Sequence, residues 1–216
     1  MATRRPPPAS DRTPPLGVAS PRASASRPVM PRVGTPAVGS PVVATPLQRD
    51  DRPARGQPGL IPLDLPDFKC FGCSPANPQG LRLKFERSGR RVVSEYLPPP
   101  QHQGWFGMVH GGLLAILLDE LGAWTAAGLC RRIGVTRDLR VHYRRPLYVG
   151  ERILLEGEIA EEKPTLITVK GVLLNERHDV GAEGEITVFP LEEAQFAKML
   201  PGGKVPEDLK AFFPRK

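Results

Sequence analysis

The sequence predicts an α+β domain in which an antiparallel sheet wraps one long central helix. Two observations lead to this prediction. Residues 107–129 read GMVHGGLLAILLDELGAWTAAGL, a glycine-rich turn followed by a run that is apolar on every side of a helical wheel. Before and after it, apolar and polar residues alternate with the period of half-buried strands, and the crossover pattern of a parallel sheet is missing.

Residues 1–66 differ in composition from the rest of the 216-residue chain. They hold 15 of its 26 prolines, no aromatic residue, and nine arginines against four aspartates. So little apolar surface predicts a disordered leader. Its charge accounts for most of the formal net charge of +7, so the folded part shows no basic excess that would indicate nucleic-acid binding.

Several roles stay open for this leader. It lacks the continuous apolar segment of a secretory signal. Its arginines and serines agree with a transit peptide, although its prolines disfavour the amphipathic helix that such peptides need. An interaction arm that docks a partner or an anionic surface is a further reading. Translation can also begin downstream of Met1, at Met30.

An entry loop and a hairpin are expected before the central helix. Residues 68–80 are rich in turn formers. Residues 81–86 alternate between apolar and charged, which predicts a half-buried strand. Ser88-Gly89 turns the chain into a partner strand over 91–97, and three prolines at 98–100 end the pair.

After the helix we expect three or four more antiparallel strands. The strand patterns fall at residues 136–148, 153–159, 166–174 and 182–189. The last part of the chain offers a short helix around Glu192 to Leu200 and a polar tail. The predicted organisation is therefore a leader over 1–66, a folded domain over 67–190, and a C-terminal helix and tail over 191–216.

The central helix carries two acids within its apolar run. Asp119 and Glu120 keep that run short of the roughly 20 apolar residues of a membrane span, so we expect a core helix and no membrane span. Burying an unpaired carboxylate costs several kcal/mol, which favours a functional role for Asp119. One curved sheet covers only part of a helix that is apolar all round. A second subunit is expected to cover the rest, giving a homodimer, with a dimer of dimers as the larger alternative.

Two glycines stand where this helix should begin. The backbone amides of Gly111 and Gly112 belong to the first turn, which has no partners within the helix and carries the positive end of its dipole. Such amides bind an anion, or an oxygen that becomes one during a reaction. The alternative is that the glycines only permit a sharp turn and close packing. The buried acid at Asp119 favours the functional reading.

Three cysteines, at positions 70, 73 and 130, do not make a disulfide framework, which favours a reducing, cytoplasmic location. Cys70 and Cys73 form a CxxC pair that could be half of a zinc site. No second pair follows, and the four histidines are not spaced as its complement. We therefore interpret the pair as packing and expect no metal.

The most informative stretches of residues 68–189 are CFGCSPANPQGLRLKF, QGWFGMVHGGLLAILLDELGAW and TRDLRVHYRRPLYVGE. Through these stretches the folded domain resembles the PaaI-type acyl-CoA thioesterases, which have the hotdog fold. Its most specific feature is HGG followed by an acid nine residues after the histidine, on a buried helix. It implies hydrolysis of an acyl- or aryl-CoA thioester to the free acid and CoA, without a cofactor.

The resemblance also assigns the principal site residues. The backbone amide of Gly111 polarises the thioester carbonyl, and Asp119 of the other subunit acts as general base or nucleophile. Geometry agrees with this division, because Gly112 and Asp119 lie about 10 Å apart along one helix. One thioester carbon cannot contact both. Glu120, about 100° further round the helix, is the fallback acid if the register differs by one.

Five further residues receive supporting roles by resemblance, each with an alternative. Thr136 helps to place the water or the acid, or is a strand-edge threonine. Gln103 stands nearest to an Asn or Gln of the loop before HGG. His110 fixes the turn by hydrogen bonds or acts as a base. Arg144 and Arg145 face the CoA phosphates, or are solvated arginines at a strand end.

A second function on the same fold is a non-catalytic domain that binds or senses acyl-CoA. Asp119 argues against it, because a binding module gains nothing from a buried acid beside the carbonyl of its ligand. Trp105, Phe106 and Trp124 are candidates for lining an acyl or aryl pocket, with core packing as the alternative.

Overall fold

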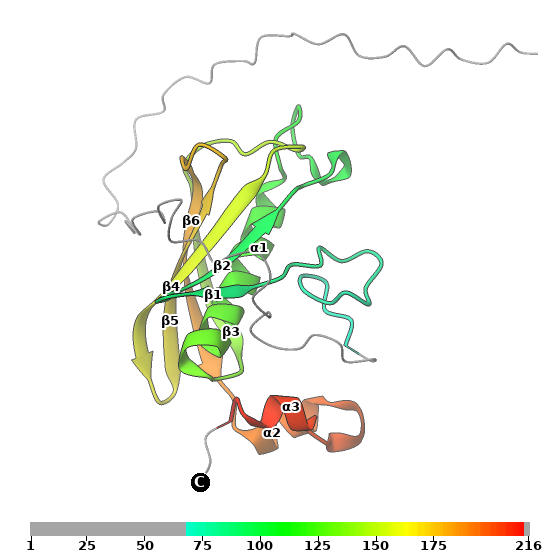
Figure 1. The fold of residues 1–216 in the computed structure, drawn as a ribbon, viewed down its shortest axis with the longest axis vertical. Helices are drawn as coiled ribbons and strands as arrows, with labels where there is room; N and C mark the ends of the chain where they lie inside the picture. The colour runs from blue at the N-terminus through cyan, green and yellow to red at the C-terminus, as the bar shows by residue number, and fades with distance from the viewer. Residues whose placement is uncertain (1–67, 214–216) are drawn as a thin grey trace, which may run out of the picture. The chain divides into compact units, whose positions relative to one another are not determined.

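The computed structural model describes residues 68–213 and shows a six-stranded antiparallel sheet against one long helix (Figure 1). The strand order is β1-β2-β4-β5-β6-β3, which is the predicted α+β hotdog arrangement. The predicted leader, residues 1–66, lies outside the described residues. The strands are β1 (Glu86–Ser88), β2 (Arg91–Tyr96), β3 (Gly134–Tyr143), β4 (Ile153–Lys163), β5 (Leu166–Leu174) and β6 (Val180–Pro190).

The prediction of a strand over residues 81–86 was wrong for most of its length. The side chains of Leu81, Leu83 and Phe85 are buried, as the alternation indicates. Of residues 81–86, however, only Glu86 pairs with the sheet, as the first residue of β1. The N–H groups of Leu81 and Leu83 instead donate to carbonyls of the entry loop. Arg82 adopts a left-handed φ of 56°, which interrupts an extended strand.

The central helix α1 (Gly111–Thr125) crosses the sheet and continues into one π-helical turn (Ala126–Cys130). It packs against β3, β4, β5 and β6, and three of its leucines are fully buried. By length and composition the segment Gly111–Cys130 could cross a membrane, yet half of it is buried inside the domain, as in the core helix of a globular fold. The fully buried leucines are Leu117, Leu118 and Leu121.

One side of α1 is only half-buried within a single chain. Ala115, Ile116, Asp119, Glu120 and Ala123 keep partial exposure to solvent. The sheet therefore covers the helix on one side, and the predicted second subunit has a surface to cover on the other.

The aromatic residues divide between the core and the surface. Trp124 is buried and stacks on Phe85 with ring centroids 5.4 Å apart, so for Trp124 the core alternative is correct. Trp105 and Phe106 are exposed, at 73% and 89%, on the loop that leads into α1.

The C-terminal segment packs more tightly than its composition indicates. The predicted short helix is present as α2 (Glu193–Met199), with a capping box between Glu192 and Gln195. A second helix, α3 (Glu207–Lys210), follows, and the tail is not simply polar as predicted. Phe212 and Phe213 are buried in a cluster with Leu209 and Ala127, at the end of the central helix, because two adjacent aromatic rings offer a large apolar surface to bury.

Gly122 marks the closest approach of helix to sheet, and we predict that Gly122→Ala destabilises the domain by about 1–2 kcal/mol. A Cβ atom there would lie 2.4 Å from Cγ2 of Ile186, a β-branched residue with little freedom to move. In an open helix the same substitution stabilises by about 1 kcal/mol. Urea unfolding measures the difference, and Ala123→Gly reports the helix-propensity effect at the neighbouring position. A more stable Gly122→Ala protein would refute the close approach.

Candidate active site

The first turn of α1 presents one backbone amide without a partner. His110 is the N-cap residue, and its Nδ1 accepts a hydrogen bond from the N–H of Gly112 at 3.0 Å. The carbonyl of Gly111 accepts one from the hydroxyl of Tyr143 at 2.8 Å. Within residues 68–213, the N–H of Gly111 has no hydrogen-bond partner. Of the two glycine amides, Gly111 is therefore the one available to a ligand.

The loop before α1 is held by its own polar groups. The hydroxyl of Tyr96 and Nδ1 of His102 share a hydrogen bond of 2.6 Å, and the carbonyl of His102 accepts from the N–H of His110. The side-chain oxygen of Gln103 accepts from the N–H of Gly107 at 3.2 Å. Gln103 thus supports the loop, and its contact with a substrate remains a prediction.

Asp119 lies eight residues after Gly111, about 12 Å along the same helix. It is half-buried, and within the described part of the chain its carboxylate makes no hydrogen bond or ion pair. Thr136 lies on β3 opposite Val188, next to a bulge at Arg137. The structure therefore does not bring Gly111 and Asp119 of one chain together.

Glu120 faces different surroundings from its neighbour. Its Oε1 lies 3.1 Å from Sγ of Cys70 in the entry loop. Burial is the main cause that raises the pKa of Glu120 to about 8, and the adjacent Cys70 acts in the same direction. The hydrogen bond from Cys73 lowers the pKa of Cys70, and the same contact, together with burial, raises that of Cys73. The cluster of Cys70, Cys73 and Glu120 therefore accommodates one negative charge more easily than two.

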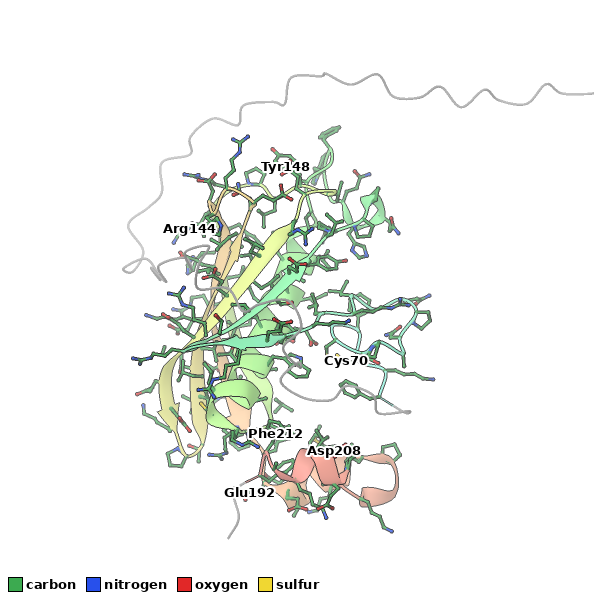
Figure 2. All side chains as sticks on the ribbon, viewed as in Figure 1. Cys70, Arg144, Tyr148, Glu192, Asp208 and Phe212 are labelled. Carbon is green, nitrogen blue, oxygen red and sulfur yellow. The ribbon has the colours of Figure 1, made fainter. Side chains whose placement is uncertain are left out.

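The two arginines predicted at the CoA phosphates are both paired. Nε of Arg144 donates to the buried Glu183 at 2.8 Å, and Arg145 pairs with Asp179 at 2.6 Å. Figure 2 shows Arg144 near the end of the sheet opposite to Phe212. Phosphate binding by either residue remains a prediction, and a phosphate would share each guanidinium with a carboxylate.

A surface hollow lies at the other end of the central helix. It is lined by Leu129 and Ile159 together with Arg87, Arg90, Arg91 and Glu158. Leu129 is 18 residues from Gly111, about 27 Å along a helix, so this hollow does not belong to the site around Gly111.

Comparison with known proteins relates part of the chain to a known family. A sequence model described as the thioesterase superfamily matches residues 106–182, the stretch that contains His110, Gly111 and Asp119. The chain is 32% identical to acyl-coenzyme A thioesterase 13 of Mus musculus over 79 residues, which cover 35% of this chain and 55% of that relative. The match thus spans about half the length of this relative.

Solved structures agree with the fold of this chain. A crystal structure described as a thioesterase superfamily protein aligns with a TM-score of 0.51 and 26% identity over 55% of this chain and 58% of that chain. A protein of Streptococcus mutans UA159, solved bound to acetyl CoA, aligns with a TM-score of 0.50 over 59% of this chain and 96% of that chain. At 16% identity, this second likeness shows the fold alone.

Two contacts in the structure could not be predicted from the sequence. Tyr143 reaches the first turn of α1 from the end of β3, 32 positions away. Cys70 reaches Glu120 over 50 positions. The CxxC pair and Glu120 can both be recognised in the sequence. The periodicity of a strand or a helix does not indicate, however, which distant element each of these residues contacts.

The N-cap at His110 leads to a prediction about stability. His110→Ala removes the acceptor for the Gly112 N–H and should cost about 1 kcal/mol of unfolding free energy. His110→Asn, which keeps a side-chain acceptor suited to an N-cap, should recover most of that loss. Chemical denaturation of both variants makes the comparison. Equal losses would mean that the hydrogen bond to Gly112 does not stabilise the helix start.

Proposed function

We propose that this protein is an acyl-CoA thioesterase that hydrolyses an acyl- or aryl-CoA to the free acid and CoA. The observation that carries the proposal is the N–H of Gly111 at the start of a buried helix, which has no partner within residues 68–213. The carboxylate of Asp119 on the same helix is likewise unpaired within these residues. Relatives named acyl-coenzyme A thioesterases support the reaction class over the matched part of the chain.

The Gly111 amide supplies the electrostatic part of the mechanism. Attack on a thioester builds negative charge on the carbonyl oxygen. A fixed N–H donor aimed at that oxygen typically lowers the barrier by about 3 kcal/mol, and the positive end of the helix dipole acts in the same direction. His110 holds the neighbouring Gly112 N–H, and this leaves the Gly111 donor to the substrate.

Asp119 of the partner subunit supplies the base or the nucleophile. As a base it takes a proton from water, whose oxygen bonds to the carbonyl carbon. The C–S bond then breaks, and CoA leaves as a thiolate that takes up a proton. As a nucleophile the carboxylate bonds to the carbonyl carbon itself, and water later hydrolyses the mixed anhydride. Either role requires the carboxylate near the carbonyl carbon, which the 12 Å separation within one chain does not allow.

The proposed homodimer places two α1 helices side by side. The half-buried side of α1, which includes Ala115 and Asp119, needs a cover that one chain does not give. Strand β3 supports this arrangement, because among the described strands it pairs with β6 alone and therefore has a free edge. A second copy along that edge would continue the sheet. A dimer of dimers and a cytoplasmic location stay part of the proposal.

A proline at position 111 tests the amide donor directly. Gly111 is the first residue of the helix, where proline is well tolerated, and His110 already has the extended backbone that precedes a proline. Gly111→Pro removes the N–H and should lower kcat about a hundredfold. Gly111→Ala is the matched control. It keeps the N–H, and its Cβ would meet Tyr143 at an ordinary 3.5 Å, so its kcat should stay close to that of wild type.

Thiol release from short, medium, long and aryl acyl-CoAs is the readout for both variants. Equal activity of the proline and alanine variants would exclude the Gly111 donor. If wild type binds these substrates and hydrolyses none, the chain is the non-catalytic binding domain considered above.

Mixed dimers test whether each site combines two chains. Asp119→Asn alone should lose about a hundredfold or more in kcat while remaining folded. Co-expression of Asp119→Asn with Gly111→Pro gives a heterodimer in which one site keeps both Gly111 and Asp119 and the other keeps neither. Its activity should approach half that of wild type. A heterodimer as inactive as its parents would place both groups of a site in one chain.

A further inference from the structure

We propose that Cys70, Cys73 and Glu120 form a zinc site that ties the entry loop to the central helix. The CxxC pair supplies two sulfur ligands from the loop, and Glu120 supplies one oxygen from α1. Water fills the fourth position. The site goes beyond the proposed thioesterase chemistry and uses none of its residues. Figure 2 shows Cys70 on the loop that runs beside α1.

The three ligand atoms already lie close to the spacing that zinc needs. Sγ of Cys70 is 3.1 Å from Oε1 of Glu120, and all three ligand atoms lie within 4.8 Å of one another. Zinc–sulfur bonds of about 2.3 Å and zinc–oxygen bonds of about 2.1 Å put tetrahedral ligand atoms roughly 3.6–3.8 Å apart. Small rotations of the side chains are enough to meet this geometry.

A backbone turn of the entry loop holds the two cysteines close together. Ser74 donates its N–H to the carbonyl of Cys70 at 3.2 Å and closes a turn. This turn encloses both cysteines of the CxxC pair. It therefore keeps the two sulfur ligands on one short segment of the loop.

Gly72 leaves the space into which the carboxylate of Glu120 fits. A Cβ atom at this position would lie 2.2 Å from Cδ of Glu120 and 2.4 Å from its Oε1. Any side chain there would push the carboxylate away from the two sulfurs. The loop and the helix are therefore matched at the contact where the three ligand atoms meet.

The charges of Cys70, Cys73 and Glu120 favour a bound cation. Cys73 is buried, and Cys70 and Glu120 are half-buried. Within residues 68–213, no lysine, arginine or histidine forms an ion pair or hydrogen bond with Glu120. Three groups that become negative on deprotonation thus meet without a positive partner, and burying such charge is costly. Thiolate ligands favour zinc over magnesium or calcium, which prefer oxygen.

Metal content of the full-length protein tests the proposal. Protein purified without chelators should contain about one zinc per chain by elemental analysis. Cobalt added to the reduced, metal-free protein should give a thiolate-to-cobalt charge-transfer band in the near ultraviolet. Both signals should disappear in Cys70→Ser and Cys73→Ser, and Glu120→Gln should weaken zinc affinity at least about tenfold. Cys130→Ser, the matched control with the third cysteine removed, should bind zinc as wild type does.

Several outcomes would overturn the site. The site is wrong if the reduced wild-type protein takes up neither zinc nor cobalt, or if the Cys70→Ser and Cys73→Ser variants keep the metal. It is also wrong if Cys70 and Cys73 form a disulfide and the protein takes up no metal after that disulfide is reduced. Because a cysteine variant can fail to fold, circular dichroism accompanies each measurement, and Glu120→Gln tests the site with both cysteines intact. Asp119→Asn should keep its zinc whatever its hydrolytic activity, so the two proposals can fail separately.

Discussion

The structure depends on the burial of α1 against the concave face of the sheet. Leu117, Leu118 and Leu121 are fully buried there. Gly122 on the helix and Gly157 and Gly171 on the strands lie where a Cβ atom would meet the opposite element at 2.3–3.0 Å. Interiors packed this closely transmit displacement instead of absorbing it. The position and rotation of α1 are therefore fixed, and with them the direction of every polar group that the helix carries.

That fixed rotation explains how two adjacent acids serve different surroundings. Successive residues of a helix point about 100° apart. Asp119 lies on the half-buried side of α1, whereas Glu120 turns toward Cys70 in the entry loop. A shift of one residue in register would exchange them, which is why Glu120 was a reasonable fallback for catalysis from the sequence. Its contact with the cysteine now gives it a different role.

Sequence periodicity was sufficient to predict most of the helices and strands. It did not predict any of the contacts between residues far apart in the sequence. The central helix, the later strands and α2 were predictable, because burial of one face imposes a period on the chain. The same period at Leu81, Leu83 and Phe85 indicated burial correctly and strand pairing wrongly, since burial does not specify which backbone accepts the hydrogen bonds. The meeting of Cys70 with Glu120 depends on tertiary packing over 50 positions, so the CxxC pair looked like an incomplete metal site.

The entry loop and the first turn of α1 satisfy their polar groups in different ways. Each is irregular backbone next to a rigid helix, and each must keep its polar groups satisfied. At the first turn, His110 and Tyr143 satisfy Gly112 and the carbonyl of Gly111, and one amide stays free for a substrate. At the entry loop, the thiol of Cys70 meets the carboxylate of Glu120 from the helix. The start of the helix thus keeps one N–H donor without a partner among residues 68–213, whereas the contact at Glu120 gathers two sulfurs and a carboxylate. An N–H donor suits an oxyanion, whereas sulfur and carboxylate ligand atoms suit a cation. The first turn of α1 and the entry loop therefore differ in the charge that they bind and in their chemistry.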